Sequence, residues 1–154
     1  MAILKQYGYI DKSDPVYLES FDADEVVRIR RELDCKLKLV QLIGSDDWKE
    51  SKTNYAEMLT EAGIKKVAEY ADGIGPWLPH LIEESNSGEI EPSPLAACAR
   101  AEKLTVHPFT YRADELPKHA KSFEELILFH RDKIKVDGFF TDQPDRVIRI
   151  LADG

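Results

Sequence analysis

The stretch Leu104-Thr-Val-His-Pro-Phe-Thr-Tyr-Arg112 decides how the rest of the chain is organised. It begins with a short apolar, β-branched run and ends in polar and aromatic groups. Such an order is typical of a parallel strand in an α/β enzyme, which is buried along its length and carries chemistry at its carboxyl end. Four other stretches repeat this plan: 16–21, 37–43, 71–75 and 136–142. We therefore expect five parallel strands with functional groups at one end.

Helical patterns separate these strands. Asp22 with Glu25, and Ser122 with Glu125, have the spacing of capping boxes at helix starts. The remaining helices are expected over 2–8 with Gly8 near the end, over 55–70 with a break at Gly63, from Pro94 onward, and from Pro144 through Ile150. The polar residues 84–94 predict a surface loop. Strand and helix thus alternate through a single domain, 1–154, which indicates a parallel sheet with right-handed crossovers.

Composition excludes several classes of partner. The 154 residues carry a formal net charge of −8 with 43% hydrophobic residues, so neither nucleic acid nor an anionic membrane is expected as the main partner. No apolar run at the N-terminus is long enough for a signal peptide or a spanning helix. Cys35 and Cys98 have no second nearby ligand, which argues against zinc. Two core thiols are favoured over a single disulfide.

The strongest candidates for a binding site follow the stretch 104–112. His107 lies at the predicted strand end beside Phe109, Thr110 and Arg112, and a functional histidine and a satisfied structural one both fit this pattern. Arg112 can grip a phosphate or carboxylate bidentately, or form a salt bridge to Asp114. The other histidines, His80, His119 and His130, are expected at the surface.

Acidic residues give a weaker signal. The pair Asp46-Asp47 and the group Asp22, Asp24 and Glu25 are better explained by helix capping and solvated loops than by metal binding. Asp142, after the last strand, can cap the next helix or reach into a site. The sequence has no nucleophile elbow, Gly-rich phosphate loop or metal-ligand helix motif. The residues alone therefore indicate a parallel α/β, enzyme-like domain with a site at its strand ends.

Five segments together resemble glycerophosphodiester phosphodiesterases of the bacterial periplasmic type. Val106-His-Pro-Phe-Thr-Tyr-Arg-Ala-Asp114 is similar to the seventh-strand motif of that family, and Val136-Asp-Gly-Phe-Phe-Thr-Asp-Gln-Pro-Asp145 to the eighth. Tyr17-Leu-Glu-Ser-Phe-Asp22, Leu39-Val-Gln-Leu-Ile-Gly44 and Tyr70-Ala-Asp-Gly-Ile-Gly-Pro76 resemble earlier segments in the right order. Two positions depart from the family pattern: Glu19 replaces a glutamine, and Gln143 replaces an aromatic residue.

The resemblance implies a fold, and it implies which part of that fold carries the catalytic residues. The family folds as a (β/α)8 TIM-type barrel, and a complete barrel needs about 200 residues or more. This chain resembles only about strands four to eight, so we expect a partial barrel, as a fragment of a longer reading frame. The catalytic histidines and acidic metal ligands of the family belong to its first strands, and no segment here matches them. None of the residues of this chain is therefore assigned a catalytic or metal-binding role.

What remains is the substrate-facing wall of the site. By resemblance it comprises His107, Phe109, Thr110, Arg112, Ser20, Trp77 and Asp142. The full-length family enzyme is expected to use a divalent metal, Ca or Mg, to hydrolyse glycerophosphodiesters to glycerol 3-phosphate and an alcohol in lipid and glycerol metabolism. This chain alone is expected to bind no metal and to be inactive. A parent of the family type would be periplasmic or secreted.

Two other hypotheses remain open from the sequence. The first is a self-contained α/β domain that binds a small anion at the same strand ends without catalysis. The second is an interaction module, a half-barrel that pairs with a missing first half, in cis or in trans. Cutting a barrel would leave the strands at 16–21 and 136–141 each with an unpaired edge and would uncover Phe21, Phe139 and Phe140, which predicts marginal stability and association.

Overall fold

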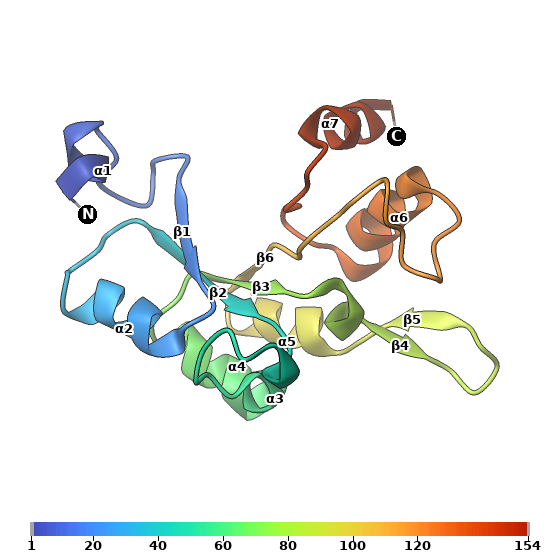
Figure 1. Ribbon diagram of the computed structural model, residues 1–154, viewed down its shortest axis with the longest axis horizontal. Coiled ribbons are helices and arrows are strands. Elements are labelled where there is room, and N and C mark those ends of the chain that lie inside the picture. The colour runs from blue at the N-terminus through green and yellow to red at the C-terminus, as the bar shows by residue number, and fades with distance from the viewer. Residues whose placement is uncertain (1, 154) are drawn as a thin grey trace.

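The computed structural model describes residues 2–153 and contains a four-stranded parallel sheet (Figure 1). Its strands lie in the order β1-β2-β3-β6 and follow the chain without reversal. The register aligns Ser20 with Gln41, Gln41 with Ile74, and Ile74 with Val106. The strand bounds are β1 Tyr17–Ser20, β2 Lys38–Ile43, β3 Gly73–Pro76 and β6 Thr105–Val106. The prediction of a parallel α/β sheet is therefore confirmed.

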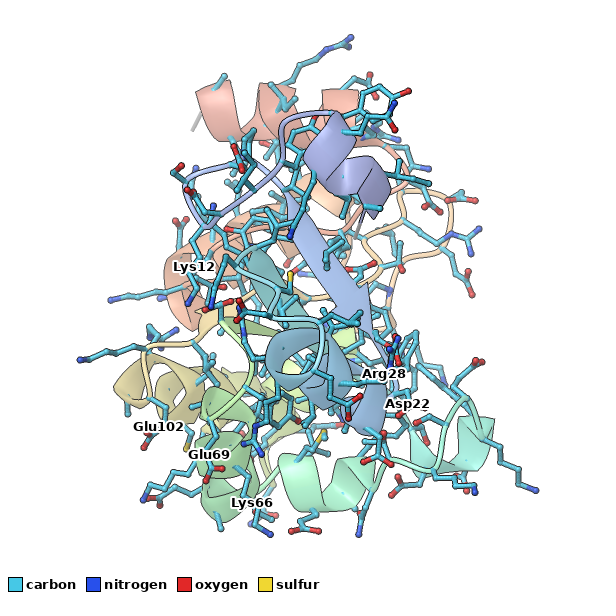
Figure 2. All side chains as sticks on the ribbon, turned by 90° about the vertical axis from the view of Figure 1, so that its left-hand side faces the viewer. Lys12, Asp22, Arg28, Lys66, Glu69 and Glu102 are labelled. Carbon is cyan, nitrogen blue, oxygen red and sulfur yellow. The ribbon has the colours of Figure 1, made fainter. Side chains whose placement is uncertain are left out.

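Helices lie between and beyond these strands. Figure 1 shows α2 to α5 together below the sheet, with α1 and α7 above it, and Figure 2 shows the same separation from the side. The bounds are α1 Ala2–Gln6, α2 Ala23–Arg31, α3 Tyr55–Met58, α4 Glu61–Ala68, α5 Leu95–Ala101, α6 Phe123–Phe129 and α7 Pro144–Asp153. Short 3-10 turns η1 (Asp46–Trp48) and η2 (Leu78–Leu81) follow β2 and β3, and a π-helical turn η3 (His130–Ile134) follows α6. Within residues 2–153, no helix is both long and apolar enough to cross a membrane.

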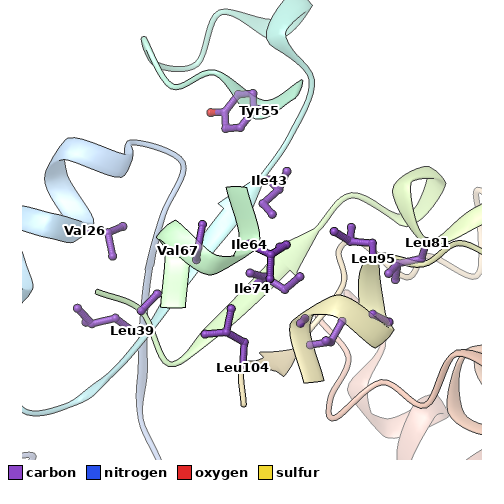
Figure 3. Packing of buried hydrophobic residues seen from close by; sticks show 14 of the residues in the cluster. Val26, Leu39, Ile43, Tyr55, Ile64, Val67, Ile74, Leu81, Leu95 and Leu104 are labelled. Atoms are coloured by element: carbon purple, nitrogen blue, oxygen red, sulfur yellow. The ribbon is translucent and has the colours of Figure 1, made fainter. Parts of the chain in front are cut away.

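The main core lies between the sheet and the helices below it (Figure 3). Leu39 and Ile43 of β2 and Ile74 of β3 are buried there beside Ile64 and Val67 of α4. Five of the six residues of β2 are buried, as expected for a parallel strand covered on both faces. A second cluster joins the segment after β6 to α6 and α7, and its buried members are Leu78, Tyr111, Phe123, Leu126, Ile127 and Val147. Both cysteines are free thiols.

The last predicted strand, 136–142, is an extended segment rather than a regular strand. Its amides still bond to the neighbouring stretch, from Asp137 N to Val106 O (2.9 Å) and from Phe140 N to Pro108 O (3.0 Å). The Val106 amide, however, donates to the side chain of Asp137, and Pro108 has no amide hydrogen to donate. The ladder is thereby reduced to one bridge, Tyr111–Thr141. The expectation of a regular strand here was wrong, although the direction and the neighbour agree with it.

The predicted loop 84–94 is also different in the structure. β4 Ile82–Glu84 and β5 Ile90–Pro92 form an antiparallel hairpin, in which Ile82 faces Pro92 and Glu84 faces Ile90. Gly88 has a φ of +83° in its turn, a conformation that glycine adopts readily. The polar composition of 84–94 concealed these two short strands.

The break in the helical pattern 55–70 falls at Leu59–Thr60, not at Gly63. Thr60 caps α4 by accepting the Gly63 amide (3.0 Å). Gly63 lies inside α4, where a Cβ atom would be 2.0 Å from the carbonyl oxygen of Glu57. This glycine therefore allows α3 and α4 to approach closely and does not end a helix.

The two predicted capping boxes are half formed. Asp22 accepts the amides of Asp24 and Glu25, and Ser122 accepts the amide of Glu125. The carboxylate of Glu25 binds Arg28 instead of returning to the cap residue, and that of Glu125 accepts the amide of Lys121. The starts of α2 and α6 nevertheless agree with the prediction.

Candidate functional site

A hollow of about 440 Å³ opens at the carboxyl ends of the strands. Three of the four strands deliver residues to it through the segments that follow them: Trp48 after β2, Trp77 directly after β3, and Phe109 and Arg112 after β6. Carboxyl ends of parallel strands meet on one side of a sheet, which is why residues distant in sequence converge here. The lining comprises Trp48, Trp77, Leu78, Pro79, Phe109, Thr110, Arg112, Glu115, Leu116 and Pro117.

Aromatic rings form one wall of this hollow. Trp48 and Trp77 pack edge to face with ring centroids 4.9 Å apart, and Trp48 lies 6.4 Å from Phe109. Phe21, after β1, packs edge-on to Phe109 at 5.5 Å. A Cβ atom at Gly44 would lie 2.7 Å from Trp48 Cε3. The glycine after β2 therefore provides the space in which Trp48 sits.

Arg112 forms the charged side of the hollow, and its guanidinium is surrounded by carboxylates. Its Nη1 lies 2.8 Å from Glu115, its Nη2 lies 3.1 Å from Asp114, and its Nε lies 3.4 Å from Asp142. The predicted salt bridge to Asp114 is thus present. Nη1 and Nη2 are therefore each paired with a carboxylate, whereas Nε is buried without a hydrogen-bond partner.

His107 lies apart from this hollow. Its ring packs against Tyr17 (centroids 4.9 Å apart) and Phe140 (6.1 Å), and a Cβ atom at Gly138 would be 2.4 Å from its Cδ2. Burial lowers the pKa of His107, and its Nδ1 is buried without a hydrogen-bond partner. The imidazole is therefore neutral at pH 7, held among aromatic rings.

The predicted site residues thus divide into two groups. Trp77, Phe109, Thr110 and Arg112 line the hollow together, and Asp142 reaches its rim through Arg112. Ser20 is not among the lining residues, and its hydroxyl accepts the amide of Asp22 (3.0 Å), which turns the chain into α2. Neither Ser20 nor His107 shares the hollow.

Six of the ten lining residues were not predicted as site residues, and Trp48 and Glu115 are the two among them that bring a large ring and a charge. Trp48 lies in a segment expected to be a polar loop, and Glu115 in one expected to be a connection. The available signal was a tryptophan within a charged segment directly after a strand end, because large apolar side chains seldom occur there without a contact.

The two departures from the family pattern have different environments. Burial raises the pKa of Glu19, which precedes Ser20 in β1. Gln143 accepts the amide of Ala113 (2.9 Å) and lies 3.5 Å from Asp114. An amide side chain at position 143 therefore ties the loop that carries Arg112 to the start of α7.

Of the other histidines, His130 was wrongly placed at the surface, and His80 and His119 are partly exposed. His130 is fully buried and its Nδ1 lies 2.9 Å from Leu126 O. His80 is half-buried, with Nε2 2.9 Å from Gly44 O and its ring edge-on to Trp77. His119 is also half-buried, and burial lowers its pKa. Helical spacing did not reveal the burial of His130, because it depends on Tyr111, which is distant in sequence.

The residues of this chain do not fit a divalent metal. Throughout the part of the chain that the structure describes, no three histidine, cysteine, aspartate or glutamate side chains group so as to hold an ion. The carboxylates nearest the hollow are engaged by Arg112.

Comparison with known proteins gives a consistent result. The sequence model of the glycerophosphoryl diester phosphodiesterase family matches residues 2–146. Glycerophosphodiester phosphodiesterases of Haemophilus influenzae and Treponema pallidum are 36% and 35% identical to the chain, over 98% and 99% of its length and 46% and 47% of theirs. The chain thus spans about half the length of these curated relatives.

A solved structure has a similar fold. The crystal structure of a Silicibacter pomeroyi protein assigned to the same class of phosphodiesterase superposes with a TM-score of 0.59 at 20% identity, over 99% of this chain and 42% of that one. The sequence match to the family covers most of the chain. This protein therefore belongs to the glycerophosphoryl diester phosphodiesterase family.

Proposed function

We propose that this chain is the carboxyl-terminal portion of a glycerophosphodiester phosphodiesterase and forms the substrate-facing wall of its site. The observation that carries the proposal is the family match over residues 2–146 in a chain whose strand ends converge on one hollow. The reaction would release glycerol 3-phosphate and an alcohol from a small-molecule glycerophosphodiester.

The strand order supports placing the chain within a barrel. β1, β2, β3 and β6 follow one another without a reversal, and the segment 136–141 runs beside the continuation of β6. A doubly wound sheet would reverse its order at a switch point. Consecutive order is what strands four to eight of a (β/α)8 barrel require.

The catalytic machinery is assigned to the other half. The family resemblance implies a divalent metal, Ca or Mg, and the described residues do not fit one. In our proposal the metal ligands and the catalytic histidines come from the missing first half, in cis or in trans. The chain's own contribution is then to bind and orient, with the Trp48–Trp77–Phe109 wall excluding water on one side.

The alternative of a small-anion-binding domain is less well supported. In that alternative the strand ends hold a small anion, and Arg112, the group there suited to grip one, lies beside three carboxylates. An anion would have to displace one of them while the other two repel it. The phosphodiester is therefore better held by groups outside this hollow.

The proposal can be tested with a chimera, in which this chain replaces the matching portion of the Haemophilus influenzae relative. Release of glycerol 3-phosphate from glycerophosphocholine would be measured for the chain alone and for the chimera, with and without EDTA. We expect activity only in the chimera, lost with EDTA. Activity of the isolated chain would refute the assignment of the catalytic groups to the first half of the barrel. A folded but inactive chimera would refute the proposal that this chain forms the substrate-facing wall of the site. The chimera that carries Glu124→Gln, on the exposed surface of α6, serves as the control for a change away from the hollow.

A further inference from the structure

We infer that a second cavity, between the helices α2, α3 and α4, is an effector site for a small zwitterion of the amino acid class. Such a ligand carries one ammonium and one carboxylate on an apolar body. The cavity lies on the helix side of the sheet, and among residues 2–153 it shares no lining residue with the hollow at the strand ends. The inference goes beyond the proposed function, because binding here needs neither catalysis nor the missing half of the barrel.

The size and the inner lining of this cavity suit a small apolar body. Its volume is about 340 Å³, within the range of small-molecule sites. Val67 at its wall is buried, and Met58 and Tyr70 are half-buried. Gly63 also lines the cavity and adds no side chain that would fill it. An apolar group that enters therefore leaves water for side chains of its own kind.

The charges of the lining select a ligand with both signs. Two acidic and two basic side chains line the cavity, and one pair of them, Glu57 with Lys66, forms an ion pair. Asp24 and Lys52 have no ion-pair partner within residues 2–153. A ligand with a single charge would pair with only one of these two groups and leave the other uncompensated. A zwitterion pairs with both.

Tyr70 indicates where the negative side of the cavity lies. Burial, and then the charge of Asp24, raise the pKa of the Tyr70 hydroxyl to about 12, so the carboxylate of Asp24 acts on this end of the ring. The hydroxyl stays protonated at neutral pH and lies 3.4 Å from Gln41 Oε1. Lys52 enters the cavity from a different segment, the loop before α3. We therefore assign the ligand ammonium to Asp24 and the ligand carboxylate to Lys52.

Thr53 connects the cavity to the strand ends. Its hydroxyl oxygen accepts the amide of Ala23 (2.9 Å) and donates to the carbonyl oxygen of Phe21 (3.1 Å). Three further donors reach the same carbonyl oxygen: Gln41 Nε2 at 3.2 Å, Ser51 Oγ at 3.3 Å and Tyr55 OH at 3.2 Å. A carbonyl oxygen has two lone pairs, so four donors compete for it. A ligand that displaces Thr53 would redistribute these hydrogen bonds.

Phe21 carries such a change to the hollow. Its ring packs edge-on to Phe109, with centroids 5.5 Å apart, and to Trp48 at 6.4 Å. Both of these rings line the hollow, whereas Thr53 and Ala23 line the cavity. One continuous set of contacts therefore joins the two spaces, which is the physical requirement for a ligand in one to alter the other.

Nuclear magnetic resonance of the ¹⁵N-labelled chain tests the binding, with L-phenylalanine as the probe at pH 7 and constant ionic strength. We expect saturable shifts of the backbone amides of Thr53, Gly63 and Val67 with a Kd of about 1 mM, a value suited to so small a ligand. Two analogues each lack one charge: 2-phenylethylamine has no carboxylate, and 3-phenylpropionate has no ammonium. Each should bind about fivefold more weakly, because one exposed ion pair is lost.

Variants assign each charge of the ligand to its partner. In Lys52→Met, L-phenylalanine should bind no better than 2-phenylethylamine, because the partner of the carboxylate is gone. In Asp24→Asn, it should bind no better than 3-phenylpropionate, because the partner of the ammonium is gone. Lys65→Met is the matched control: Lys65 is exposed on α4, outside the lining, and its loss should leave all three affinities unchanged. Circular dichroism melts verify that each variant is folded.

The same spectra test the coupling to the hollow. Trp48 and Trp77 are the only tryptophans of the chain, and both line the hollow rather than the cavity. We expect the indole N–H signal of Trp48 to shift with the same Kd as the amide of Thr53. Thr53→Val removes the hydroxyl that reaches Phe21 O, so this indole shift should fall at least about twofold at saturation.

Four outcomes would contradict the inference. Equal affinity for all three probes would show an apolar crevice without charge recognition. The absence of saturable shifts up to about tenfold above the expected Kd would show that no such site exists. Shifts of the indole signals without shifts of the cavity amides would place the ligand in the hollow. Shifts of the cavity amides without any indole shift would refute the effector role.

Discussion

Tyr111 and His130 pack edge to face in the second core, with ring centroids 5.2 Å apart and planes at 88°. Both side chains are fully buried. The Tyr111 hydroxyl and His130 Nε2 are buried without hydrogen-bond partners, while His130 Nδ1 lies 2.9 Å from Leu126 O. Burial lowers the pKa of His130 from 6.5 to about 4. The folded chain therefore holds this imidazole neutral where an unfolded chain would protonate it.

We predict that His130 makes the fold sensitive to mild acid. Its contribution is intact above pH 6.5 and is lost as the pH falls from 6.5 towards 4, because only the unfolded state takes up the proton in this range. Between pH 8 and pH 5 this site should cost about 2 kcal/mol of the free energy of unfolding. Urea denaturation at several pH values measures the effect.

His130→Phe keeps a ring of similar size and should flatten this pH dependence. His119→Gln is the control, because that imidazole is only half-buried and should contribute less. An unchanged pH dependence in His130→Phe, with His119→Gln showing the larger effect, would contradict the assignment to His130.

Gly63 should be indispensable at the crossing of α3 and α4. In an open helix, Gly→Ala gains about 1 kcal/mol from helix propensity. Here the added methyl would lie 2.0 Å from the backbone oxygen of Glu57, which cannot move without shifting α3. We therefore expect Gly63→Ala to lower the free energy of unfolding by about 2 kcal/mol, measured by urea denaturation.

The neighbouring Ala62→Gly separates propensity from sterics. Ala62 is exposed in the same helix, so this substitution should cost about 1 kcal/mol through propensity alone. If Gly63→Ala stabilised the chain, the close approach of the two helices would be refuted.

These cases show how far the sequence predicts this fold. The apolar runs ending in polar residues located β1, β2, β3 and β6, and the signal is most direct for β2 and β3, where burial along the strand leaves a mark on composition. The capping residues Asp22 and Ser122 located two helix starts, because capping is a local interaction. Local signals were therefore reliable.

Features that depend on distant partners were missed. His130 is buried because Tyr111 packs against it, and Trp48 lines the hollow because Trp77 and Phe109 converge from other strands. The guanidinium of Arg112 forms an ion pair with Asp142, which is thirty positions away in the chain. The residues of the site were thus partly predictable, whereas its charge balance was not.

We predict that Asp72 stabilises the end of the sheet opposite to the hollow. Its side chain accepts the amide of Leu39 (2.9 Å) and pairs with Arg30 and Lys12. Only 19% of the side chain is exposed. Asp72→Asn keeps the shape but removes the charge, and hydrogen bonds to charged groups contribute about 1.5 to 3 kcal/mol each. We expect a loss of about 2 kcal/mol in the free energy of unfolding, measured by urea denaturation.

Asp34→Asn provides the matched control for this loss. Asp34 is 77% exposed, pairs only with Lys36, and has a φ of 48°, which asparagine accepts as well as aspartate does. Asp34→Asn should not change the free energy of unfolding measurably. Equal effects of the two substitutions would indicate that the Asp72 network contributes nothing specific.

The last prediction concerns the edge of the sheet at β1. This strand pairs with β2 on one side, and no other strand of residues 2–153 pairs with it on the other. Tyr17 is 39% exposed on the same strand. An open edge with an apolar side chain can pair with another chain. We expect concentration-dependent association at micromolar protein, detected by sedimentation velocity together with binding of a hydrophobic dye.

Tyr17→Lys places a charge on this edge and should shift the chain towards monomer, because lysine on an edge strand opposes pairing between sheets. Tyr7→Lys makes the same substitution at a residue that is 74% exposed outside the sheet, after α1, and should leave the association unchanged. If both variants behave alike, charge in general and not the β1 edge controls association. A monomer at all concentrations, with a sharp melt and no dye binding, would show that this edge does not template pairing.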